Sequence, residues 1–161
     1  MTRAADKTVT IEERLRRINR KKNLVLFISI HANSSYNSQA SGIETFCLKQ
    51  SLFSRGPSSM DQCSVSFVQN KNSIMYKKSW ELASRLQKNI LLYAKREYPR
   101  IINRHVKHSV ARMLLGVPLP GVLIEIGFLS NKIEARLLKK EYYRTLLAQG
   151  IFKGIVQFVH Q

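Results

Sequence analysis

The chain has 161 residues, of which 44% are hydrophobic, enough for one domain with an apolar core and too many for a disordered chain. It contains no uninterrupted apolar run of about eighteen residues, so we expect no membrane span, and its first residues lack the apolar segment of a signal peptide. The 27 basic residues exceed the 10 acidic residues, and the net charge of +17 favours binding to a polyanion. No zinc-finger, RNP or KH signature accompanies this charge, so we expect no specific binding to nucleic acid.

The N-terminal third predicts a helix followed by a strand. The helix covers Thr10–Lys22, with Thr10 as the N-cap and Glu13 three positions later, which is the spacing of a capping box. The apolar run Leu24–Ile30 follows at once. A continuous apolar run with polar flanks is typical of a central strand that is buried on both faces. The polar stretch His31–Ser41 is predicted to be a loop.

The middle of the chain predicts a second strand over Gly42–Leu48 and a helix from Tyr76 to about Arg96. Between them, residues 49–73 are rich in Ser, Asn and Gln and are predicted to form a long loop inserted into the domain. A loop of this length in a compact domain is usually functional or mobile. Cys47 and Cys63 lack metal-binding spacing, and free thiols are favoured over a disulfide.

The C-terminal third predicts one more buried strand and two helices. The strand covers Val122–Ile126. Asn131 is expected to cap a short helix that ends at Lys140, and the last helix runs from about Tyr142 to Val159. Gly150 and Gly154 lie on this last helix and would allow close packing. Helices that alternate with apolar strands indicate an α/β fold in a single domain.

Two residues interrupt the apolar pattern at positions suited to chemistry. His31 directly follows a predicted strand, where α/β folds place ligands and catalytic groups, and a neutral imidazole there can bind a metal. Glu125 lies inside an apolar strand, where a carboxylate is costly unless it is paired or bound to a metal. The alternatives remain a histidine that hydrogen-bonds a backbone carbonyl and a glutamate paired with an arginine. Together the two residues are compatible with a metallohydrolase, in which the metal acidifies a water and the carboxylate accepts its proton.

A catalytic zinc needs three protein ligands, so His31 alone cannot hold one. The other histidines are His105, His108 and His160. His105 and His108 lie in a basic segment and are expected to face solvent or substrate, and His160 adjoins the C-terminus.

Several segments resemble motifs of one family in their order and rough spacing, and the resemblance extends over nearly the whole chain. The zinc-dependent N-acetylmuramoyl-L-alanine amidases of the Amidase_3 type carry a motif that resembles FISIHAN, a strand that resembles SGIETF, and a motif that resembles VLIEIGFLSN. In this chain these segments are Phe27–Asn33, Ser41–Phe46 and Val122–Asn131, and residues 2–14 resemble a further family segment.

The resemblance implies a peptidoglycan hydrolase that cleaves the amide between N-acetylmuramic acid and L-alanine. It implies that His31 binds Zn²⁺ and that Glu125 is the catalytic base. It also implies a twisted, mainly parallel or mixed sheet with helices on both faces, and a periplasmic or extracellular location at the cell envelope. An activator protein and a regulatory role for the insertion at 49–73 are further expectations.

The chain departs from the family pattern at its start. The family's first zinc-binding histidine, in a GHGG motif, and its glutamate ligand are both absent. We therefore expect residues 1–161 to be the C-terminal part of the catalytic domain, without the first strand and helix, and to be weakly active or inactive. The alternatives are a non-catalytic cell-wall-binding module and a basic nucleic-acid-binding protein.

Overall fold

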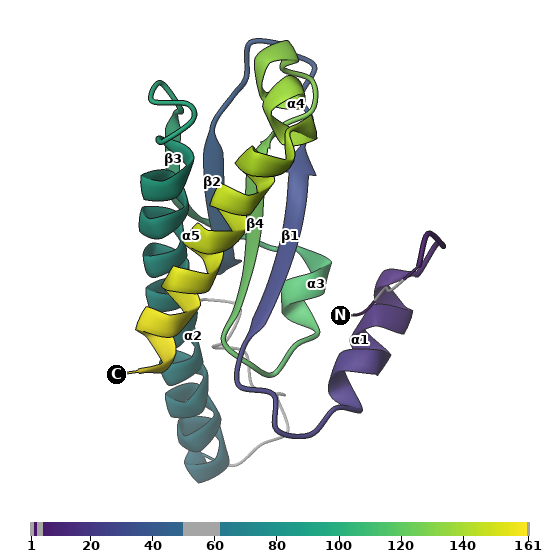
Figure 1. Ribbon diagram of the computed structural model, residues 1–161. Coiled ribbons are helices and arrows are strands. Elements are labelled where there is room, and N and C mark those ends of the chain that lie inside the picture. Colours follow the sequence, from purple (N-terminus) through teal and green to yellow (C-terminus); the bar gives the residue numbers. More distant parts are fainter. Residues whose placement is uncertain (1, 3–4, 50–61, 161) are drawn as a thin grey trace.

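The computed structural model describes residues 2, 5–49 and 62–160, and for residues 62–72 it describes the backbone alone. Helices and strands alternate irregularly along this part of the chain (Figure 1). In chain order they are α1 (Ile11–Asn19), β1 (Phe27–Asn33), β2 (Ile43–Leu48), α2 (Gln62–Ala94), β3 (Asn103–Ser109), α3 (Arg112–Leu115), β4 (Gly121–Phe128), α4 (Lys132–Lys139) and α5 (Glu141–Val159). In the described part of the chain, no helix has the length and apolar character needed to cross a membrane.

The strands form one mixed sheet in the order β1-β4-β2-β3. β1 is parallel to β4, β2 is parallel to β3, and the central pair β2 and β4 is antiparallel. Helices α2 and α5 pack side by side on one face of the sheet, whereas α1 and α3 lie on the other side (Figure 1). The predicted α/β fold, a mixed sheet flanked by helices on both faces, is confirmed.

The predicted helix caps form as expected. Thr10 Oγ1 accepts a hydrogen bond of 3.2 Å from the backbone N–H of Glu13, although Glu13 itself pairs with Arg17 instead of completing a capping box. Asn131 Oδ1 accepts from the backbone N–H groups of Ile133 and Glu134 and so begins α4. Each cap satisfies N–H groups that the first turn of a helix leaves unpaired.

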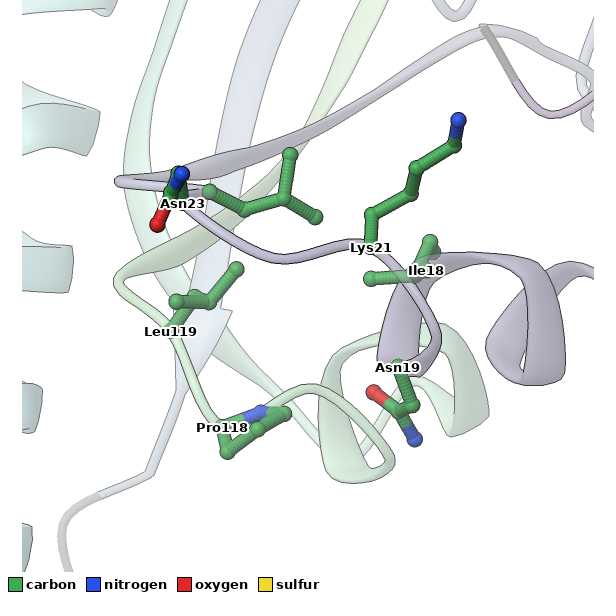
Figure 2. A pocket seen from close by; sticks show the side chains of 7 residues that line it. Ile18, Asn19, Lys21, Asn23, Pro118 and Leu119 are labelled. Carbon is green, nitrogen blue, oxygen red and sulfur yellow. The ribbon is translucent and has the colours of Figure 1, made fainter.

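Helix α1 packs beside α3 at the end of the sheet where β1 and β4 begin. Ile18, Met113 and Val117 form a small apolar cluster there, and Phe27 of β1 packs against it. A pocket of about 180 Å³ opens next to this cluster (Figure 2). Its walls come from the end of α1 and from the segments that precede β1 and β4, namely Ile18, Asn19, Lys21, Asn23, Leu24, Pro118 and Leu119.

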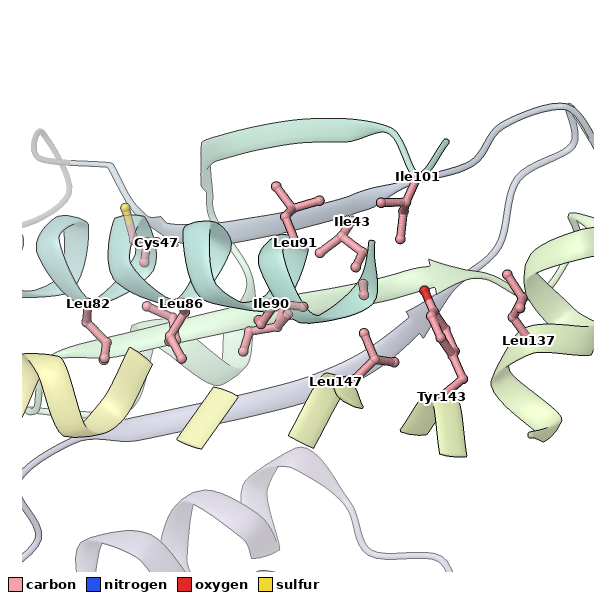
Figure 3. Packing of buried hydrophobic residues seen from close by; sticks show 14 residues of the cluster. Ile43, Cys47, Leu82, Leu86, Ile90, Leu91, Ile101, Leu137, Tyr143 and Leu147 are labelled. Carbon is pink, nitrogen blue, oxygen red and sulfur yellow. The ribbon is translucent and has the colours of Figure 1, made fainter. Parts of the chain in front are cut away.

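The main core lies between the sheet and the helix pair α2 and α5. Leu86 and Ile90 of α2 and Leu147 of α5 meet Ile43 and the other inward residues of the strands (Figure 3). The close helix packing that the two glycines predicted is confirmed. A Cβ at Gly150 would come within 2.7 Å of Ile90 Cα, and one at Gly154 within 3.0 Å of Leu86 Cα. Cys47 is a buried free thiol in the same core, as favoured above, whereas the side chain of Cys63 lies outside the described residues.

Helix α2 begins at Gln62, so the prediction of a loop extending to residue 73 is wrong. No glycine or proline occurs between Asp61 and Tyr98. Ser, Asn and Gln lower helix propensity by at most about 0.7 kcal/mol each, so a polar stretch without such breakers continues the helix that follows it. Residues 50–61, the remainder of the predicted insertion, lie outside the described residues.

Strand β1 is at the edge of the sheet, so the prediction of a central strand buried on both faces is wrong. Ile30 is 54% exposed and Val25, just before the strand, is 68% exposed. An apolar run by itself does not distinguish a central strand from an edge strand. Among the described residues no strand pairs with the outer edge of β1. That the chain lacks a first strand and helix stays a prediction.

Candidate active site on the open face of the sheet

His31, Glu125 and Glu44 form a row across the sheet. His31 of β1 and Glu44 of β2 are both register partners of Glu125 on β4. Thr45 Oγ1 donates to Gln87 of α2, so Thr45 faces α2 and its neighbour Glu44 faces the opposite side. The row therefore lies on the face away from α2 and α5. On this face α1 and α3 pack against Phe27, at the end of the sheet where β1 and β4 begin, and α3 also contacts β2 and β4. The structure thus brings the two predicted site residues together, and their roles stay predictions.

Glu125 has a carboxylate oxygen with no partner. Its Oε2 is fully buried and accepts no hydrogen bond from any described residue. Burial raises the pKa of Glu125 to about 7, and the negative charge of Glu44 contributes in the same direction. A carboxyl group with a pKa near neutrality can both accept and return a proton at neutral pH, which is what a general acid–base catalyst needs.

Glu44 is a site residue to which the sequence analysis assigned no role. Only 4% of it is exposed, and its carboxylate accepts from Asn33 Nδ2 at 2.9 Å, Arg104 Nε at 3.0 Å and Lys107 Nζ at 2.6 Å. Burial would raise the pKa of Glu44, but the hydrogen bonds from Lys107 and Arg104 outweigh burial and lower it. Glu44 therefore stays charged beside Glu125. Environments that separate the pKa values of neighbouring carboxyl groups are typical of active sites.

The sequence offered a signal for Glu44 that matches the one for Glu125. Each is a carboxylate within an apolar strand segment, IETFCL for Glu44 and VLIEI for Glu125. The partners of Glu44 could not be anticipated, because Arg104 and Lys107 belong to β3, a strand that the sequence analysis did not predict.

His31 is held by a short contact at one of its ring nitrogens. Nε2 lies 2.7 Å from Ser29 Oγ. Burial lowers the pKa of His31, and the positive charge of Arg14 on α1 lowers it further. Both effects favour the neutral imidazole, the form that binds metal ions. His105 and His108 are exposed on β3 as expected, and the ring of His108 lies 5.0 Å from that of Trp80 instead of in the row.

The pocket in Figure 2 lies at the end of the sheet where β1 and β4 begin, whereas His31 and Glu125 lie towards the other ends of these strands. Lys21 is the one titratable residue in its lining. The open face with the carboxylate row is therefore the better candidate for an active site.

Comparison with known proteins decides the family. The family described as N-acetylmuramoyl-L-alanine amidase matches residues 1–157. The chain belongs to this family. Among curated relatives, amidase AmiA of Salmonella typhimurium is 30% identical over 99% of the chain and 60% of its own length. A putative amidase of Buchnera aphidicola from Acyrthosiphon pisum is 27% identical over 98% of the chain and 74% of its own length.

Solved amidase structures share the fold. An N-acetylmuramoyl-L-alanine amidase from Clostridium difficile 630 superposes with a TM-score of 0.74 at 25% identity, over 99% of this chain and 70% of that one. The CwlD amidase from Clostridioides difficile, solved in complex with the GerS lipoprotein, gives a TM-score of 0.69 at 27% identity, over 99% of this chain and 74% of that one. The chain thus spans about 60% to 74% of the length of these relatives and structures.

The zinc ion that the family resemblance implies does not fit the described residues alone. They contain no group of three His, Cys, Asp or Glu side chains placed to hold a metal ion. The row offers one histidine and two glutamates, and Glu44 is already bound by Asn33, Arg104 and Lys107. A catalytic zinc needs three protein ligands. The described residues therefore support proton transfer at Glu125, and no metal-dependent step follows from them.

Proposed function

We propose that this amidase-family chain carries the proton-transfer face of a peptidoglycan hydrolase, which cleaves the amide between N-acetylmuramic acid and L-alanine. The observation that carries the proposal is Glu125, whose buried Oε2 has no partner among the described residues and whose pKa is raised to about 7. Membership of the amidase family supports the choice of substrate.

In the proposed reaction, Glu125 accepts a proton from the water whose oxygen attacks the amide carbonyl carbon. It then returns that proton to the alanine nitrogen as the carbon–nitrogen bond breaks, so that Glu125 ends in its starting state. Glu44 stays ionised throughout because Arg104 and Lys107 stabilise its charge. A single base of this kind contributes a factor of about 10² to 10⁴ in rate.

We include a zinc ion in the proposal because the family that the chain resembles is zinc-dependent. The neutral imidazole of His31 would supply one of the three protein ligands that a catalytic zinc needs. The described residues do not supply the others. Turnover by the chain alone is therefore expected to be slow.

We place the protein at the cell envelope, periplasmic or extracellular, because peptidoglycan lies outside the cytoplasm. The net charge of +17 supports adhesion to an anionic wall. An activator protein is a further part of the proposal. It is supported by the CwlD relative, whose structure was solved in complex with a lipoprotein.

A second candidate function is a non-catalytic module that binds peptidoglycan. It is favoured by the absence of a three-ligand metal group among the described residues. One experiment separates the two candidates. The chain is incubated with peptidoglycan and excess Zn²⁺, and both bound protein and newly released alanine amino groups are measured for the wild type and Glu125→Gln.

Release by the wild type that the variant loses would support the hydrolase. Binding without release by either protein would support the second candidate. Neither binding nor release would contradict both.

A further inference from the structure

Arg104 lies on the open face with its terminal nitrogens unused. Its Nε donates to Glu44 at 3.0 Å, and its guanidinium carbon lies 5.1 Å from the ring centre of Phe128. These two contacts fix the plane of the guanidinium group. Among the described residues, neither Nη atom makes a hydrogen bond, and the side chain is 34% exposed. An oriented guanidinium with two free NH₂ groups matches the geometry of a carboxylate.

A strained bulge in β3 gives Arg104 this orientation. Ile43 pairs with Asn103 and Thr45 with Val106, so two residues of β3, Arg104 and His105, lie opposite Glu44. His105 has a φ of 65°, a value that is uncommon for residues other than glycine.

The bulge is held in place by Asn103. Its Oδ1 accepts from the backbone N–H of His105 at 2.9 Å and from Gln87 Nε2 of α2 at 2.8 Å.

The consequence of the bulge is that two cations reach one face. In a regular strand, residues three apart point to opposite faces of the sheet. The extra residue at His105 shifts this alternation, so that Arg104 and Lys107 both contact Glu44. Two positive charges there meet one negative charge, which leaves an excess of one positive charge beside Glu44, on the β3 side of the row. Strained backbone that re-aims side chains is concentrated at functional sites.

We propose that Arg104 binds a carboxylate of the peptide stem and thereby selects the substrate, an inference that rests on the proposed function. The distance fits the stem. β3 is separated from β4 by β2, and two strand spacings amount to about 10 Å. An extended peptide covers about 3.4 Å per residue. With the scissile amide beside Glu125, Arg104 lies about three residues along the stem. The carboxylate that it binds therefore belongs to the second or third stem residue.

The test compares two ligands that differ only in the charge of their carboxylates. One is N-acetylmuramoyl tripeptide with free carboxylates, and the other is the same compound with its carboxylates converted to primary amides. Affinities for the 161-residue chain are measured by NMR titration. The wild type should bind the free acid about tenfold or more tightly than the amide, the effect expected for a charge-assisted bidentate pair. Arg104→Gln should remove this preference.

Two further variants keep the test decisive. Arg104→Lys retains the charge and an ion pair with Glu44 but lacks the two-pronged donor, so most of the preference should be lost. Arg100→Gln removes the same charge at an exposed position outside the row and should keep the full preference.

The outcomes distinguish a failure of the role proposed for Arg104 from a failure of the proposed function. Equal affinity of the wild type for acid and amide, or an unchanged preference in Arg104→Lys, would overturn the role of Arg104 and leave the proposed function standing. If the wild type bound neither ligand, the proposed function would fall and the inference with it.

Discussion

Replacing Glu134 by alanine should destabilise the protein and displace the carboxylate row. Glu134 is 2% exposed, and its two oxygens accept backbone hydrogen bonds from Gly42 at 2.7 Å and from Phe128 at 2.8 Å. These bonds join the residue before β2, which carries Glu44, to the end of β4, which carries Glu125. Glu134 on α4 therefore fixes the relative position of the two site strands.

The expected loss of stability in Glu134→Ala follows from the two buried backbone N–H groups that lose their hydrogen-bond acceptor. Each buried donor that loses its partner costs about 1–3 kcal/mol, so Glu134→Ala should lower the free energy of unfolding by about 2–6 kcal/mol. That is a large fraction of the 5–15 kcal/mol typical of a domain. Glu134→Gln should lower the free energy of unfolding by about half as much. Its amide oxygen still accepts one of the two hydrogen bonds, but its NH₂ group is a donor and cannot accept the other.

Urea denaturation of the two variants and the wild type measures these differences. Glu12→Ala is the control. Glu12 makes a solvent-exposed ion pair with Arg112, and removing an exposed pair should change the urea midpoint little. A midpoint for Glu134→Ala equal to that of the control would refute the reasoning.

Three other outcomes are expected. Gly150→Ala should lower the free energy of unfolding by about 1–3 kcal/mol, because its Cβ would meet the backbone of Ile90. Gly121→Ala should cost less, because a Cβ there has at least 3.4 Å of clearance. Thermal melts of the two variants and the wild type measure the difference. Metal analysis after dialysis should find well under one zinc per chain, and a stoichiometric, chelator-resistant zinc would reveal a site not recognised among the described residues. Burial raises the pKa of the Cys47 thiol to about 11. In a Cys63→Ser variant, a thiol reagent at pH 8 should therefore react with Cys47 only after the protein unfolds. Rapid reaction of the folded protein would show that Cys47 is accessible.

The sequence predicted those parts of the site that stand out against apolar strands. The sequence predicts His31 as a site residue because it directly follows an apolar run and Glu125 because it interrupts one, and the structure makes them register partners. Glu44 carries the same signal but was not interpreted. Glu44 is recognised as a site residue only through its contacts with Arg104 and Lys107, about sixty residues later in the chain. Contacts of that kind depend on strand order, which local patterns do not specify.

The elements that were missed or misjudged have local causes. Strand β3 reads NRHVKHS, with one apolar residue, because it is an edge strand whose side chains are largely polar. Strand β1 has the apolar composition of a central strand but lies at the other edge. Helix α2 starts in a polar segment whose composition resembles a loop. Composition indicates the burial and the type of element that a segment most often has. Each of these three segments differs from that usual case.

The central claim is that Glu125 transfers the proton in amide hydrolysis, and Glu125→Gln tests it most directly. The variant keeps the shape of the side chain but cannot accept a proton. Release of alanine amino groups from peptidoglycan is measured with excess Zn²⁺ for the wild type and the variant, with binding measured in parallel. We predict slow but measurable release by the wild type, a loss of about 100-fold or more in the variant, and unchanged binding. Equal release by the two proteins would show that Glu125 is only a buried structural carboxylate and would contradict the account.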